Sequence, residues 1–131
     1  MIDEIKDMIR NKRTYEAELE YLVGCLNDTE LENQIVIGER IAYLRQKLSI
    51  ISSWMKVLTE DGAFVTQRHL IDGIDIPRIV AEYEAKWGRE FAKSERTSKT
   101  YQQRAIKHIV EFEQRKLQNN INVYQDHRYD S

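Results

Sequence analysis

The chain has 131 residues, of which 41% are hydrophobic and 32% are charged, values that suit a globular protein of one domain or two small ones. Five glycines and one proline are too few for the turns of a many-stranded sheet, so the composition favours an all-α fold. The single cysteine, Cys25, excludes an internal disulfide and a cysteine-ligated zinc, and the net charge of -2 gives no overall attraction to nucleic acid. Because no apolar run is long enough to span a bilayer and the N-terminus lacks the apolar core of a signal peptide, we expect a cytoplasmic protein with no membrane partner.

Residues 1–58 carry two heptad stripes, in which apolar residues recur at steps of four and three. The first stripe is interrupted only at Lys12 and consists of Met1, Ile5, Met8, Tyr15, Leu19, Leu22 and Leu26. Thr29 and Glu32 then have the spacing of a capping box, which predicts the start of a second helix that runs to about Leu58. Its stripe consists of Ile37, Ile41, Leu44, Leu48, Ile51, Met55 and Leu58.

Two matching stripes predict an antiparallel helical hairpin over residues 1–58. One interpretation of this arm is a structural spacer. The other is a dimerisation or partner-docking coiled coil, because apolar residues such as Val36, Ile50 and Trp54 flank the stripe and need cover. The pattern leaves both interpretations open, and a homodimer through residues 1–58 is one partner that it allows.

Three further helices are predicted in residues 59–118. Thr59 is the expected N-cap of a short helix that ends at Gly73, and Asp75 is the expected cap of the next, with Pro77 in its first turn. The broad apolar face of that second helix is made by Ile76, Ile79, Val80, Tyr83 and Trp87, before Gly88 ends it. Ser94 opens a last helix that reaches Lys116 or beyond. Residues 119–131 are polar without a clear period, which predicts a loop or frayed end.

The last helix carries a local excess of positive charge, since residues 93–109 contain five lysines and arginines against one acid. Successive residues turn by about 100 degrees, which places its core-facing residues in one quadrant: Tyr101, Ala105, Ile109 and Phe112. The opposite side presents Arg96, Thr100, Gln103 and Lys107, flanked by Lys99 and Arg104. These residue types pair with guanine, adenine, the thymine methyl and phosphates, so the face suits the major groove of DNA, although a plain solvated face has the same composition.

The order of residues in this half resembles the helix-turn-helix of sigma factor region four. The resemblance covers roughly residues 58–110 and is carried by Ser94, Glu95 and Arg96 at the start of the last helix and by the run RAIKHI over 104–109. The layout is also similar to phage regulators of the ArpU and RinA type. One departure is a connection between Tyr83 and Ser94 that is longer than the tight turn of the family.

The resemblance implies sequence-specific binding of double-stranded DNA for transcriptional regulation in a phage or prophage, with RNA polymerase as a further partner. It implies that Ser94 caps the recognition helix and that Glu95 accepts from a cytosine amine. Four residues would then contact bases or nearby phosphates: Arg96, Lys99, Thr100 and Gln103. Arg104 and Lys107, further along the helix, would contact the DNA backbone. The predicted DNA-binding residues are therefore Ser94, Glu95, Arg96, Lys99, Thr100, Gln103, Arg104 and Lys107.

Two other functions remain open: a phage small terminase subunit that binds DNA for packaging, and a protein-interaction module without DNA binding. We expect neither enzymatic activity nor a cofactor. His69 with Asp72, and His108 with Glu111, have one-turn spacing, but two ligands are too few for a metal site. Core packing is the better interpretation of both tryptophans.

Overall fold

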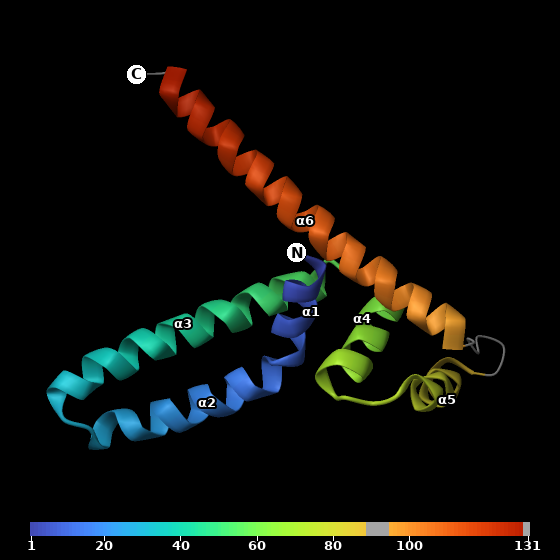
Figure 1. The fold of residues 1–131 in the computed structure, drawn as a ribbon, viewed down its shortest axis with the longest axis horizontal. Helices are drawn as coiled ribbons and strands as arrows, with labels where there is room; N and C mark the ends of the chain where they lie inside the picture. Colours follow the sequence, from blue (N-terminus) through green and yellow to red (C-terminus); the bar gives the residue numbers. More distant parts are fainter. Residues whose placement is uncertain (89–94, 130–131) are drawn as a thin grey trace.

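The computed structural model describes residues 1–88 and 95–129, with residues 95 and 121–129 described by their backbone alone (Figure 1). Within these residues the protein is all-α and contains no strand. Its six helices are α1 (Ile2–Arg10), α2 (Lys12–Cys25), α3 (Leu31–Lys56), α4 (Glu60–Thr66), α5 (Ile76–Trp87) and α6 (Glu95–Tyr129). None of these helices combines the length and the apolar content that crossing a membrane requires. The predicted all-α class is confirmed.

The single helix predicted over residues 1–26 is wrong, because the chain bends at Asn11 between α1 and α2. The Asn11 side-chain amide donates to the carbonyl of Asp7 at 2.9 Å, which gives that carbonyl a side-chain donor as well as the backbone N–H of Asn11. Asparagine favours such local bonds over a continuous helix, and Lys12 interrupts the apolar stripe at the same point. The bend turns α1 away from α2 and against α6 (Figure 1).

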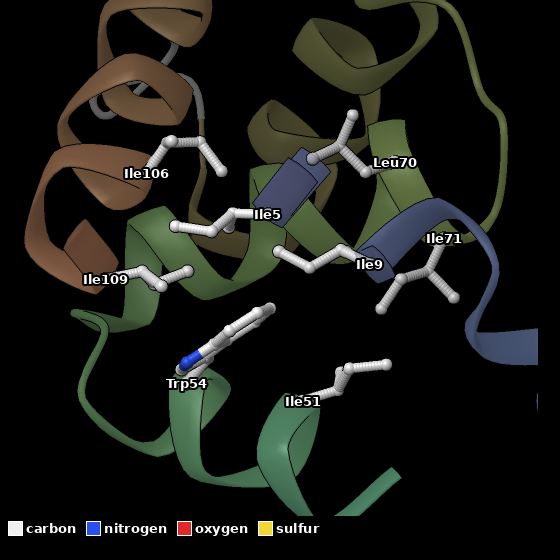
Figure 2. Packing of buried hydrophobic residues seen from close by; sticks show 8 residues of the cluster. All are labelled: Ile5, Ile9, Ile51, Trp54, Leu70, Ile71, Ile106 and Ile109. Carbon is white, nitrogen blue, oxygen red and sulfur yellow. The ribbon is translucent and has the colours of Figure 1, made fainter. Parts of the chain in front are cut away.

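The main core forms around α1 (Figure 2). Ile5 and Ile9 from α1 lie among side chains of three other segments, and Ile9 is completely buried. The surrounding buried residues are Ile51 and Trp54 of α3, Leu70 and Ile71 of the π-helical turn Gln67–Ile71, and Ile106 and Ile109 of α6. This core joins residues on both sides of position 58, so the arm and the following part share their packing. The functional division at that position stays a prediction.

The α2 and α3 helices run antiparallel and project from the core as a pair (Figure 1). Arg40 holds the pair together through two hydrogen bonds to the Glu18 carboxylate, at 2.7 and 3.0 Å. No residue of α2 is buried, so this pair depends on half-buried contacts. The predicted capping box is wrong: α3 begins at Leu31 behind Glu30, and the Thr29 hydroxyl donates to the carbonyl of Cys25 at 2.8 Å. Thr29 therefore lies one residue too early to cap α3.

The start of α4 and both ends of α5 lie where the sequence predicts them. The Thr59 hydroxyl accepts from the backbone N–H of Gly62 at 3.2 Å, which confirms Thr59 as the N-cap of α4. Gly73 follows the π-helical turn at a φ of 69°, and Gly88 follows α5 at a φ of 94°, conformations that favour glycine. Asp75 occupies the N-cap position of α5, although its side chain makes no capping hydrogen bond there.

The last helix is longer than predicted. The prediction of a loop or frayed end over residues 119–131 is wrong for residues 119–129, because α6 continues to Tyr129; residues 130–131 lie outside the described part. The stretch from Glu95 to Tyr129 contains no glycine or proline and is rich in glutamine, lysine, arginine and glutamate, so nothing in it interrupts a helix. At 1.5 Å per residue, α6 is about 50 Å long.

Candidate nucleic-acid interface

The structure brings most of the predicted DNA-binding residues together on one side of α6. Five of them are exposed to solvent and Thr100 is half-buried; the exposed residues are Arg96, Lys99, Gln103, Arg104 and Lys107. Glu95 begins α6, but its side chain lies outside the described residues, as does Ser94, so their predicted roles are not located. We call the six located residues the α6 polar face.

The opposite side of α6 anchors the helix. Ala105 and Ile109 are buried, as predicted, and Tyr101 and Phe112 are half-buried. Ile106 is also buried, although the helical projection did not place it in the core quadrant. Its burial follows from the position of α1, which covers a side of α6 that was expected to face solvent.

A close approach of α4 fixes the other flank of α6. Gly62 lies against Ala105, and a Cβ at Gly62 would come within 3.4 Å of the Ala105 Cβ and 3.2 Å of the Thr59 hydroxyl oxygen. The α5 helix packs on the same side through Ile79, which is fully buried in a small cluster. Half-buried Tyr101 of α6 packs against that cluster. The α1, α4 and α5 helices all pack against α6 (Figure 1), and the α6 polar face lies on the side that they leave uncovered.

The cations of the α6 polar face have no neutralising partner in the described part of the chain. Arg96, Lys99, Arg104 and Lys107 form no ion pair or side-chain hydrogen bond there. Several other arginines are paired; for example, Arg68 donates to the Glu82 carboxylate at 2.6 and 2.7 Å and to Asp72 at 2.7 Å. The positive charge of α6 is therefore available to an external anion.

Thr100 is the one member of the face whose polar group is already engaged. Its hydroxyl donates to the carbonyl of Arg96, one turn earlier, at 2.9 Å. An acceptor lone pair and the methyl group remain for other contacts.

Two hollows lie beside the α6 polar face, in the angle between α6 and α1. The first, which we call the polar hollow, has a volume of about 250 Å³ and is lined by Lys6, His69, Ile76, Lys99, Gln102 and Gln103. The second, the apolar hollow, has a volume of about 240 Å³ and is lined by Ile2, Lys6, Gln103, Ile106, Lys107 and Val110. Lys6 was missed from the sequence, because nothing in the heptad pattern indicates that α1 lies along α6.

A third hollow, of about 380 Å³, lies on the other flank of the face. Arg104 and His108 line it from α6, and Thr59 and Asp61 line it from the start of α4. Asp61 accepts a hydrogen bond of 2.7 Å from the Tyr83 hydroxyl. The α6 polar face thus lies between two recessed flanks, each with basic side chains at its edge.

His69 and the two tryptophans make contacts within the protein. The Nδ1 atom of His69 lies 2.9 Å from the carbonyl oxygen of Ile74. Trp54 is buried in the main core, which confirms its predicted role, and Trp87 packs with Phe64 and Tyr83 in an aromatic cluster. The described residues contain no group of three or more histidine, cysteine or acidic side chains that could hold a metal.

No family model, curated protein or solved structure matches the chain. The likeness to sigma factor region four therefore depends on the residues quoted above, and the function must be argued from the geometry of α6.

Proposed function

We propose that this protein binds double-stranded DNA through the α6 polar face and regulates transcription, in a phage or prophage. The observation that carries the proposal is the outward position of Arg96, Lys99, Gln103, Arg104 and Lys107 on one rigid helix, with their cations unpaired in the described residues. Opposite charges one turn apart on a helix can pair with each other. The half-buried Glu111 lies one turn after Lys107, but no ion pair joins the two in the described residues.

The dimensions of α6 suit the major groove. A helix with its side chains is about 10–12 Å wide, and the groove is about 12 Å wide. Residues 96–107 rise by about 16 Å along the axis, enough to present several side chains to consecutive base pairs. Arg96 offers paired donors to base edges, and Gln103 offers a donor and an acceptor. Lys99, Arg104 and Lys107 offer charge to phosphates.

The arrangement of α4, α5 and α6 supports a helix-turn-helix interpretation. In that interpretation α5 is the scaffold helix and α6 is the recognition helix, as the resemblance to sigma factor region four implies. Contacts between α5 and α6 and between α4 and α6 are consistent with this role. The longer connection between Tyr83 and Ser94 departs from the family, and we expect it to change the angle at which α6 meets the duplex.

A protein-docking role for the α2–α3 pair is a second candidate function. This pair lies outside the α6 polar face. Several of its large apolar side chains are exposed: Tyr21, Val23, Leu31, Ile35, Val36 and Tyr43. Exposed apolar residues on a projecting arm are typical of an interface with a protein. A second copy of the chain and RNA polymerase are the candidate partners.

Binding to DNA is tested by fluorescence anisotropy with a pool of random duplexes at increasing salt. We expect the wild-type protein to bind and its affinity to fall steeply as salt rises, because phosphate contacts release counterions. The double variant R96A/K107A should lose most of this binding. The matched control R45A/K56A removes the same charge from α3 and should bind like wild type. Equal binding by the two variants, or none by wild type at low salt, would contradict the proposal.

The mass of the protein in solution separates the remaining alternatives. Sedimentation equilibrium of a dimer or monomer agrees with a regulator, whereas a closed ring of many copies would favour a small terminase subunit. Protein association without any duplex binding would leave the interaction module as the function.

A further inference from the structure

The polar hollow and the apolar hollow share two residues, Lys6 of α1 and Gln103 of α6. Lys99 lines the first hollow and Lys107 lines the second, so three lysines from two helices border one continuous region. Every charged side chain that lines either hollow is a lysine, and His69 adds a titratable group. No carboxylate of the described residues lines them.

The acids on the surrounding elements do not compensate for this charge. Asp7 of α1 pairs with Arg10 at 3.3 Å. Asp72, after the π-helical turn, is engaged by Arg68 and Arg13. Asp3, Glu4, Asp75 and Glu111 line neither hollow, although Glu111 lies one turn after Lys107 on α6. Lysines brought together in this way repel one another, and an anion between them relieves that repulsion.

The remaining lining groups suit a phosphate oxygen. Gln102 and Gln103 carry side-chain amides that donate without charge. The Nδ1 atom of His69 is held 2.9 Å from the carbonyl oxygen of Ile74, so the neutral donors that this hollow offers to an anion are the amides of Gln102 and Gln103. Lys6 is half-buried, so part of its side chain packs against the protein and keeps the residue beside the hollow.

We propose that the polar hollow binds a phosphodiester group of the DNA backbone, with Lys6 and Lys99 as its cationic ligands. This inference rests on the proposed function, and it assigns α1 to the interface. When α6 lies in a major groove, phosphates run along both of its flanks. Lys6 and Lys99 then contact the backbone on one flank, and Arg104 and His108 contact it on the other.

The test compares Lys6→Gln with Lys6→Arg and with the control Arg45→Ala, by anisotropy on a duplex of fixed sequence at several salt concentrations. Lys6→Gln keeps the first two methylenes of the stem and a side chain without charge, and circular dichroism verifies that the variant folds. We expect Lys6→Gln to weaken binding roughly fivefold and to reduce the slope of log affinity against log salt by about one. Lys6→Arg should retain wild-type binding, and so should Arg45→Ala.

The loss in Lys6→Gln should be equal for unrelated duplexes, because a phosphate contact carries no sequence information. An unchanged affinity and slope in Lys6→Gln, with binding still lost in R96A/K107A, would overturn the phosphate site and leave the proposed DNA function intact.

A second arm separates the duplex backbone from a free anion. Wild-type and Lys6→Gln proteins are titrated with inorganic pyrophosphate and followed by backbone amide shifts. Weak shifts at Lys6, Lys99 and Gln102 that need millimolar pyrophosphate, and that vanish in Lys6→Gln, support a backbone site. Saturation at micromolar pyrophosphate would overturn it in favour of a free phosphate ligand. If wild type binds no duplex, the proposed function fails, and this titration alone then decides whether the hollow binds phosphate at all.

Discussion

The indole Nε1 of Trp54 donates a hydrogen bond of 2.6 Å to Oε1 of Glu113. Trp54 is buried near the end of α3, and Glu113 is half-buried on α6 beyond the polar face. The same carboxylate lies 3.5 Å from the Lys116 ammonium group. This bond links the α2–α3 arm to α6, so the orientation of the arm is coupled to that of the candidate recognition helix.

Replacing Glu113 tests that link. Glu113→Leu leaves a buried indole N–H without an acceptor, so we expect the free energy of unfolding to fall by about 1–3 kcal/mol. Glu113→Gln keeps an acceptor oxygen and should cost less. Urea unfolding followed by circular dichroism measures both values. A leucine variant as stable as the glutamine variant would show that the bond contributes nothing.

The central position of α1 gives a second prediction. Ile9 is completely buried in the main core, and its truncation to alanine should cost about 2–5 kcal/mol, whereas Ile9→Val should cost about 0.5–1.5 kcal/mol. Ile35 is 63% exposed on α3, so Ile35→Ala should change stability by no more than about 0.5 kcal/mol. Urea unfolding curves provide the comparison, and the valine variant keeps it measurable if the alanine variant does not fold. Equal costs at Ile9 and Ile35 would mean that α1 is not part of the core.

The helices that depend on local signals were predictable. Thr59, Gly73, Pro77 and Gly88 mark helix ends through backbone chemistry that acts within a few residues. The outward position of Arg96 and its neighbours likewise follows from helical periodicity alone.

The position of α1 was not predictable in the same way. The heptad periodicity favours a continuous helix through Asn11, whereas the local hydrogen bond of Asn11 permits a bend and the packing of Ile9 against α3 and α6 sets where α1 lies. Lys6 enters the candidate site through that tertiary contact, so no pattern within α1 indicates its role. The end of α6 is hard to predict for a different reason, since the polar composition of residues 119–129 is typical of a loop or frayed end, although no glycine or proline there breaks the helix.

Tyr83 gives the protein a specific sensitivity to alkaline pH. Burial of the ring and the hydrogen bond from its hydroxyl to Asp61 raise the pKa of Tyr83 to about 12. In an unfolded chain the pKa of tyrosine is about 10, so the folded state favours the protonated hydroxyl. The stability that this hydroxyl contributes is complete below pH 10 and is lost as the pH rises through about 12.

Tyr83→Phe removes this titration. We expect the variant to be less stable at pH 7 by about 1 kcal/mol, because it lacks the bond to Asp61. The difference in unfolding free energy between wild type and variant should then shrink between pH 10 and 12. Urea unfolding at a series of pH values measures it, and a difference that stays constant across this range would exclude the Tyr83 hydroxyl as its source.

The α6 polar face predicts two separable effects on DNA recognition, which depend on a preferred duplex selected from a random pool. Arg96→Ala and Gln103→Ala should each reduce the preference for that duplex over a scrambled one by about 1–3 kcal/mol, because these side chains are assigned to base edges. Lys107→Ala should weaken binding to both duplexes equally and reduce the salt slope by about one, because it is assigned to a phosphate. The control Arg45→Ala should change neither quantity. A loss of preference in Lys107→Ala, with none in Arg96→Ala or Gln103→Ala, would mean that α6 meets the groove through a different turn, as the longer connection before it allows.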